Sequence, residues 1–264
     1  MGHPTKANEW SLDQKLSAIK AAGFDGVCWG GSPELRDGCR RHGLVFVGGM
    51  VSGKASEFAG LLQAQKDCGA FHVNVQLAAD EVLTPEALEL ALALNREGRR
   101  IGVVPGIETH RGTCTETPEK CYALCDAYEK ATGELLPLSI DFSHFAVVKH
   151  LVPESFVKRL LVRPDLIQLA RQFHFRPFNG HHAQVPITNE QGELTQEVRD
   201  WLPFAEALLR CWLDGNRDTD AEIFVCPELG PIEGGYALST FRNSWEEAKV
   251  MREQIGKMWD RLAS

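Results

Sequence analysis

The sequence of 264 residues predicts an α/β protein, a (β/α)8 TIM barrel that forms a single domain over residues 1–264. Short apolar segments alternate with helical patterns along the whole chain, which is typical of a parallel sheet with helices outside it. Eight such units can be counted, and eight units in about 260 residues is the usual size of this barrel. No Gly-x-Gly-x-x-Gly motif follows the first strand, which weighs against the alternative, a doubly wound dinucleotide-binding sheet.

Seven strands are indicated by apolar runs that lead into polar loops or helix starts. They cover residues 24–29, 44–49, 71–77, 101–108, 136–142, 172–176 and 222–227. We expect one more strand before them, around residues 6–10, because a helix follows directly. Ser11 and Gln14 form a capping box that opens this helix, and Gly23 is placed to end it. The last helix is expected over residues 245–262.

Composition excludes several classes of protein. The formal net charge of -8 disfavours nucleic acid as a partner, because binding to a phosphate backbone needs a clustered basic surface. No stretch approaches the roughly 18 unbroken apolar residues of a membrane span, and the N-terminus has no apolar signal core. The eight cysteines form no Cys-x-x-Cys pair, so a thiolate zinc site is not indicated. We therefore expect a cytoplasmic protein with reduced thiols and no membrane or nucleic-acid partner, and a homo-oligomer stays open.

Four polar residues stand near the C-terminal tips of four consecutive predicted strands, on the face that points to the barrel axis. They are Glu108, Asp141, His174 and Glu228. The assignment follows from the alternation of side chains along a strand, with the large apolar residues turned toward the helices. Each residue alone is more typical of a helix cap, a loop ion pair or a core histidine, but the recurrence favours a common site. Three carboxylates on one axis repel one another, which predicts a bound divalent cation.

The donor set indicates which cation to expect. Oxygen and imidazole ligands without sulfur favour Mn²⁺, Mg²⁺ or Co²⁺ over a structural zinc site, although Zn²⁺ stays possible, and Mn²⁺ is the ion we expect. The strand 71–77 adds an inward polar set, His72, Asn74 and Gln76, which suggests a polar substrate wall.

At this point the sequence resembles the xylose isomerase-like TIM barrel superfamily of sugar isomerases and epimerases. The resemblance rests on GIETH, DFSHF, FHFRPFNG and CPELG, which contain the four tip residues in order. It implies that Glu108, Asp141, His174 and Glu228 hold one metal ion. It also implies that His144, in Asp141-x-x-His144, contacts the substrate. Arg176 would contact a substrate oxygen.

The chemistry implied by the resemblance is proton abstraction beside a carbonyl of a small carbohydrate, through a metal-bound enediolate. We expect Glu108 and Glu228 to be the acid/base pair, with His144 orienting a hydroxyl. The expected substrate-binding residues are Trp29, His72, Gln76, His110 and Arg176.

Two alternatives stay open. One is a metal-dependent lyase of the keto-inositol or dehydroshikimate dehydratase type, which shares the scaffold and the enolate chemistry. The other is a barrel that binds a sugar without turnover, which an apo structure with the four tips salt-bridged instead of metallated would support. An endonuclease of the same superfamily is disfavoured by the net charge of the chain.

Overall fold

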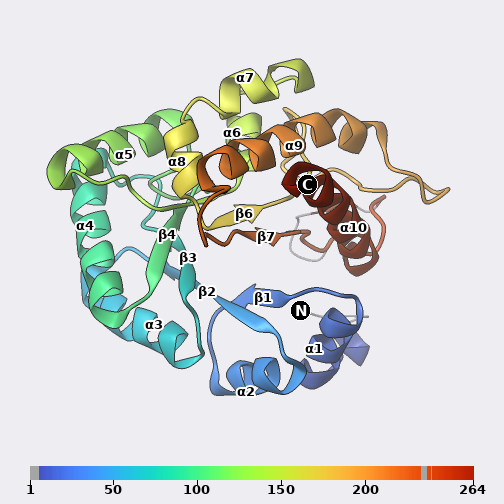
Figure 1. Cartoon of the computed structure of the whole chain (residues 1–264), viewed down its shortest axis with the longest axis horizontal. Coiled ribbons are helices and arrows are strands. Elements are labelled where there is room, and N and C mark those ends of the chain that lie inside the picture. The colour runs from blue at the N-terminus through green and yellow to red at the C-terminus, as the bar shows by residue number, and fades with distance from the viewer. Residues whose placement is uncertain (1–5, 233–236, 239) are drawn as a thin grey trace.

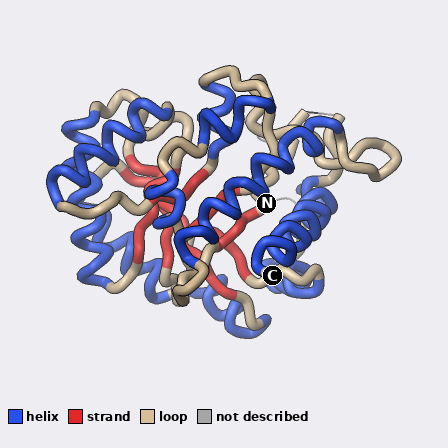
Figure 2. The backbone as a smooth tube through the Cα atoms, turned by 45° about the horizontal axis from the view of Figure 1, so that its top comes forward, coloured by secondary structure: helices blue, strands red, loops and turns tan. Residues whose placement is uncertain are grey.

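The strands form the centre of the molecule and the helices surround them. The computed structural model describes residues 6–232, 237–238 and 240–264, and within these residues seven strands form one parallel sheet in sequence order (Figure 1). The strands are β1 (Gly26–Trp29), β2 (Val45–Ser52), β3 (His72–Leu77), β4 (Val104–Glu108), β5 (Leu138–Ile140), β6 (Gln172–His174) and β7 (Phe224–Cys226). Figure 2 shows the strands in red with the helices in blue around them. The sheet curves into a nearly closed barrel, which confirms the expected fold class.

Helices follow nearly every strand, as a parallel sheet requires. The longer helices are α1 (Leu12–Ala21), α2 (Pro33–His42), α3 (Ala55–Asp67), α4 (Thr84–Ile101), α5 (Pro118–Thr132), α9 (Gln196–Asn216) and α10 (Ser244–Ala263). The short ones are η1 (Lys6–Asn8), α6 (Phe142–Val148), η2 (Pro153–Ser155), α7 (Phe156–Leu160) and α8 (Pro164–Leu169). The capping box is confirmed, since Ser11 accepts from the Gln14 backbone and the Gln14 side chain accepts from the Ser11 backbone.

The expected strand around residues 6–10 is wrong. The chain forms the 3-10 helix η1 there and then enters α1. The segment Lys-Ala-Asn-Glu-Trp offers no run of apolar side chains for a barrel wall to bury, so a turn that leads into the capping box is the better solution. The seam of the barrel consequently lies between β1 and β7, which share no ladder among the described residues.

The outer face of the strands packs on the helices, as the side-chain alternation predicted. On β6 and the residue after it, the rings of Phe173 and Phe175 stack with centroids 6.1 Å apart, and both side chains are buried. Phe175 meets the edge of Trp201 in α9 at 5.4 Å. This alternation turns Gln172 and His174 toward the barrel axis.

The parallel register brings the C-terminal ends of β4 to β7 to one rim. Glu108 pairs with Ser139, Ile140 with Phe173, and His174 with Cys226. The residues that end or follow these strands therefore stand at one level, although they are far apart in the sequence.

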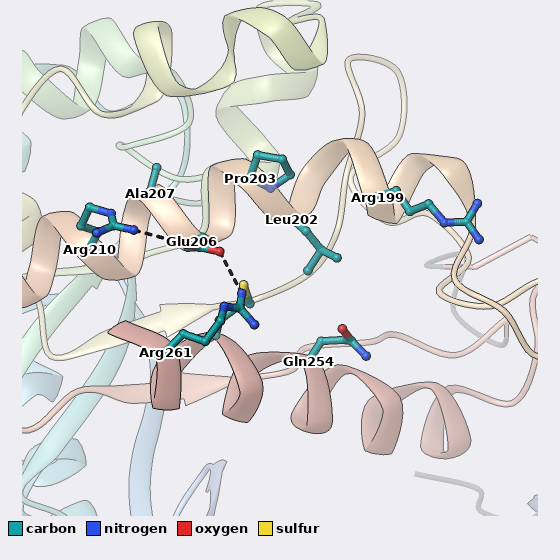
Figure 3. Close-up of a pocket in the computed structure, with 9 residues that line it drawn as sticks. Arg199, Leu202, Pro203, Glu206, Ala207, Arg210, Gln254 and Arg261 are labelled. Atoms are coloured by element: carbon teal, nitrogen blue, oxygen red, sulfur yellow. Dashed lines mark hydrogen bonds and ion pairs between the residues drawn. The ribbon is translucent and has the colours of Figure 1, made fainter. Parts of the chain in front are cut away.

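A surface groove lies away from this rim, between the outer helices α9 and α10. It encloses about 550 Å³, and Arg199, Leu202, Glu206, Arg210 and Arg261 are among its lining residues. Arg210 and Arg261 flank Glu206 and pair with its two oxygens at 3.3 and 2.9 Å (Figure 3). The two cations are thus balanced in part by the carboxylate between them.

None of the described helices combines the length and the apolar character that a membrane span demands.

Candidate metal centre

The four predicted ligands come together at the rim. Glu108 ends β4, Asp141 follows β5 and caps α6, His174 ends β6, and Glu228 lies two residues beyond β7. One ligand atom from each side chain lies within 4.8 Å of those of the other three. His174 Nδ1 is 3.1 Å from Glu108 Oε1 and 3.0 Å from Glu228 Oε2.

Three of the potential metal-ligand atoms in this cluster make no hydrogen bond. His174 Nδ1, Glu108 Oε1 and Glu228 Oε2 are all buried and make no hydrogen bond of acceptable geometry, although they lie about 3 Å apart. Buried polar atoms without partners are costly, so such a group calls for a ligand. Carboxylate oxygens and an imidazole nitrogen that converge on one point suit a divalent cation. These residues therefore fit a metal ion.

Hydrogen bonds from β3 fix the orientation of Glu108. Asn74 Nδ2 donates to Glu108 Oε2 at 2.7 Å, and Gln76 Nε2 donates to the same oxygen at 3.1 Å. Oε1 is thereby left for the cluster. The alternation of polar residues along β3 predicted that Asn74 and Gln76 belong to a polar substrate wall. It did not predict that both side chains donate to Glu108.

Two threonines hold the strand tips. Thr109 Oγ1 accepts from the Asp141 backbone N–H at 2.8 Å and donates to the Asp141 carbonyl at 2.9 Å. Thr115 Oγ1 donates to the Glu108 carbonyl at 2.5 Å. Neither residue was predicted as part of the site. Thr115 reaches the tip only because the loop after β4 turns back, which no local pattern indicates.

Arg176 pairs with the carboxylates instead of projecting freely into the mouth of the barrel. Its Nη2 donates to Asp141 Oδ2 and to Ser143 Oγ, and its Nη1 is 3.7 Å from Glu228 Oε2. Asp141 Oδ1 accepts from the Ser143 backbone N–H at 2.9 Å. Both oxygens of Asp141 are therefore engaged before any ligand arrives.

Two histidines form one wall of the site. The rings of His110 and His144 meet edge-on with centroids 4.4 Å apart. Together with Glu108 they also bring ligand atoms within 4.8 Å of one another. His144 Nε2 is only 3.0 Å from Arg176 Nη2, however, so a second cation there would face a guanidinium. This arrangement suits contact with a substrate better than a second metal ion.

The surroundings of His174 and His144 shift the pKa values of the two histidines in opposite directions. Burial lowers the pKa of His174, but the carboxylates of Glu228 and Glu108 outweigh burial and hold that pKa well above its usual range. Burial lowers the pKa of His144 to about 4, against the opposing effect of Asp141. Near neutral pH the metal-free chain therefore carries a charged His174 and a neutral His144.

The glutamates are ionised by the same interaction. Burial raises the pKa of Glu108, yet the positive charge of His174 outweighs this effect and brings the pKa to about 2. Glu228 shows the same balance, and its pKa lies well below the usual range. The two carboxylates differ in access, because the Glu228 side chain is 40% exposed and that of Glu108 only 1%.

Two further residues predicted to contact the substrate, Trp29 and His72, lie apart from the cluster. Trp29 ends β1 and is 55% exposed. The preceding Cys28 points to the barrel axis, where its Sγ meets Gln172, so the alternation turns the Trp29 side chain away from the axis. His72 begins β3 and lies deep inside, where its Nε2 is 3.1 Å from Ser139 Oγ and its ring stacks on Phe224. His72 is thus separated from the rim that holds the other candidates.

Comparison with known proteins identifies the fold. No family model matches the chain, and no curated protein matches it either. Among solved structures, an L-ribulose 3-epimerase has a TM-score of 0.67 at 12% identity, over 95% of this chain and 89% of that one. A xylose isomerase-like TIM barrel protein from Mycobacterium smegmatis in complex with magnesium has a TM-score of 0.61 at 14% identity, covering 96% and 89% of the two chains. A probable 3-DHS dehydratase from Bacillus anthracis has a TM-score of 0.57 at 14% identity, covering 93% and 94%. The chain therefore has the xylose isomerase-like barrel fold that the resemblance predicted.

Proposed function

We propose that the chain is a divalent-metal-dependent isomerase or epimerase of a small carbohydrate, with Mn²⁺ held by Glu108, Asp141, His174 and Glu228. The observation that carries the proposal is the convergence of their ligand atoms within 4.8 Å, three of them buried and without hydrogen bonds. The expected localisation is cytoplasmic. The similarity in fold to a sugar epimerase, and to a barrel crystallised with magnesium, supports the reaction class and the type of cofactor.

A divalent cation in this position would polarise a substrate carbonyl and stabilise negative charge on its oxygen. The proton on the adjacent carbon would be removed by one glutamate and returned by the other. Glu108 is fixed by Asn74 and Gln76, so it suits transfer at a single defined position. Glu228 is more exposed and suits exchange of its proton with water.

The other residues bind and orient the substrate. His144 is neutral near pH 7 and could donate or accept one hydrogen bond with a substrate hydroxyl. His110 lies against it and would limit how the sugar enters. Arg176 pairs with Asp141 and its Nη1 lies 3.7 Å from Glu228 Oε2, so a substrate oxyanion bound beside these carboxylates would meet its guanidinium.

The first experiment tests the metal. Purified protein stripped with a chelator should take up one equivalent of Mn²⁺, and replacing any one of the four ligands by Ala should weaken binding sharply. Protein that takes up no Mn²⁺, Mg²⁺, Co²⁺ or Zn²⁺ contradicts the proposal.

The second experiment tests the acid/base pair. The Mn²⁺-loaded protein is incubated in deuterium oxide with keto-sugars, inososes and hydroxypyruvate, and exchange at the carbon beside the carbonyl is followed. Glu108→Gln and Glu228→Gln should each slow exchange by about 10² to 10⁴. Glu129→Gln, on the outer helix α5, is the matched control. Equal exchange in wild type and both site variants rules out these glutamates as the base. Loss of water from the substrate instead of rearrangement would identify a lyase.

A second candidate is a barrel that binds a sugar without turnover. It is favoured by the ion pairs that join His174 to both glutamates and Arg176 to Asp141. Saturable sugar binding without solvent exchange, with or without Mn²⁺, would establish it in place of the enzyme.

A further inference from the structure

A buried glutamine lies directly beneath the candidate metal centre. Gln172 precedes His174 by two residues on β6, so both side chains point to the barrel axis, and Gln172 is fully buried. Its Nε2 is 2.7 Å from His174 Nε2 and 3.4 Å from the Sγ of Cys28 on β1. The Gln172 carboxamide thus contacts the edge of the His174 ring that faces away from the cluster.

The same carboxamide also lies against a second histidine. The Gln172 side chain lies within hydrogen-bonding reach of His72 on β3, although no hydrogen bond of acceptable geometry joins them. Beyond it, His72 Nε2 is 3.1 Å from Ser139 Oγ, and this hydroxyl donates to the Gly106 carbonyl at 3.3 Å. A Cβ at Gly106 would stand 2.7 Å from both His72 Cε1 and Ser139 Oγ, so the glycine makes room for this layer of side chains. A chain of polar groups therefore crosses the barrel below the rim.

Two atoms of this chain are unpaired. In this orientation the carboxamide nitrogen of Gln172 faces His174. Gln172 Oε1 and His72 Nδ1 are then buried without a hydrogen-bond partner. A rotation of the carboxamide by 180° exchanges its oxygen and its NH2 group without moving other atoms. After the rotation the oxygen faces His174 Nε2 and the NH2 group faces His72 Nδ1. Both unpaired atoms are then used.

The rotated arrangement is the one that a metal on His174 Nδ1 requires. An imidazole that ligates through Nδ1 carries its proton on Nε2, and this N–H needs an acceptor. The carboxamide oxygen supplies it, while its nitrogen donates to His72 Nδ1. His72 Nε2–H can then donate to Ser139, whose hydroxyl already donates to Gly106.

We propose that Gln172 is a positioning residue for the metal centre, whose carboxamide oxygen holds His174 in the Nε2–H tautomer and leaves Nδ1 free to bind the cation. The inference rests on the metal centre of the proposed function. The amide NH2 group of Gln172 at the same time fixes His72 as the Nε2–H tautomer. The buried histidine pair is thus set by one side chain, and His72 acts below the metal instead of on the substrate.

Spectroscopy of the wild-type protein tests the proposal without any activity. The chain is labelled with ¹⁵N at histidine and loaded with Zn²⁺, which is diamagnetic. The His174 ring should show a metal-bound Nδ1 and a directly bonded, slowly exchanging proton on Nε2. His72 should carry its proton on Nε2 and a bare, hydrogen-bonded Nδ1. Metal on Nε2 of His174, or a proton on Nδ1 of His72, overturns the proposal.

Metal affinity provides the second measurement. Gln172→Met keeps the length of the side chain but removes the acceptor, and should weaken Zn²⁺ and Mn²⁺ binding by about 10- to 100-fold in chelator competition. Gln65→Met is the matched control, because Gln65 is a buried glutamine of α3 that accepts from Gly31 N–H outside the barrel. The control should bind metal as wild type does. Gln172→Met with wild-type affinity overturns the positioning role.

The outcomes separate the two proposals. Wild-type protein that binds no divalent cation overturns the metal centre and the role of Gln172 together. Wild-type protein that binds tightly, with Gln172→Met equally tight, overturns the role of Gln172 alone. If Gln172→Met does not fold, the wild-type tautomers decide.

Discussion

Replacing Arg176 by Met tests whether Asp141 belongs to the metal centre. The guanidinium and the Asp141 carboxylate form an ion pair in which the side chains are 3% and 1% exposed. The change leaves Asp141 buried with only the Ser143 N–H at 2.9 Å and nearby His144 to support its charge. Removing one partner of a buried ion pair costs about 3–5 kcal/mol, because the other charge stays desolvated. This is a large part of the stability of an ordinary domain.

The cation should restore part of this loss. If Asp141 is a ligand, bound Mn²⁺ supplies the positive charge that the variant lacks. The destabilisation measured with saturating Mn²⁺ should then be smaller than without it. By linkage, each tenfold tightening of Mn²⁺ binding in the variant corresponds to about 1.4 kcal/mol of recovered stability.

Urea unfolding with and without Mn²⁺ measures both quantities. Arg163→Met serves as the control, because Arg163 pairs with Asp126 and Asp165 on outer helices and its side chain is 22% exposed. Its loss should be small and independent of Mn²⁺. The reasoning is refuted if Arg176→Met loses less than about 1 kcal/mol, or if Mn²⁺ stabilises the variant and the wild type equally.

Three further predictions concern pH and packing. Because the pKa of His174 is raised in the metal-free chain, a cation that binds His174 must displace its proton. Titration calorimetry should therefore show that Mn²⁺ binding weakens about tenfold when the pH falls by one unit around neutrality. An affinity that does not change with pH would mean that His174 is not a ligand. Glu247→Gln should cost about 1–3 kcal/mol in urea unfolding, because the Glu247 carboxylate accepts from the N–H and hydroxyl of Thr188, and it should leave the Mn²⁺ affinity unchanged. Gly106→Ala should lower the free energy of unfolding by a similar amount and also weaken Mn²⁺ binding, because the new Cβ would displace His72. An unchanged melting temperature would show that the side chains below the rim accommodate the extra methyl group without cost.

The convergence of the four tip residues could be predicted because it depends on local geometry. A strand alternates its faces with a period of two, and parallel strands end at one rim, so Glu108 and His174 could be placed without knowing any long-range contact. Asp141 and Glu228 lie just beyond their strands, close enough that the alternation still points them inward. The same rule placed Gln172 and His72 inside the barrel, but it does not give depth along the axis. The alternation therefore could not show that His72 lies below the rim, beside Ser139.

The errors and omissions arise where a local pattern competes with another structure. Asp141 is also a helix N-cap, and α6 begins at once after it, where the sequence analysis extended the strand to residue 142. The first strand was inferred only because a helix follows directly, and the chain forms η1 instead. The partner of Arg176 could not be predicted either, since its pairing with Asp141 depends on the spacing of β5 and β6.

The charges at the rim explain how the chain can fold before it binds a cation. Three carboxylates, Glu108, Asp141 and Glu228, face one guanidinium and one imidazolium, so the metal-free site keeps a single negative charge. His174 and Arg176 thus make the cluster of carboxylates tolerable, which a bare group of three would not be. A dication that replaces the proton on His174 brings the site to neutrality. The substrate would then meet a neutral centre whose positive charge is concentrated on the metal ion, where negative charge develops during proton abstraction.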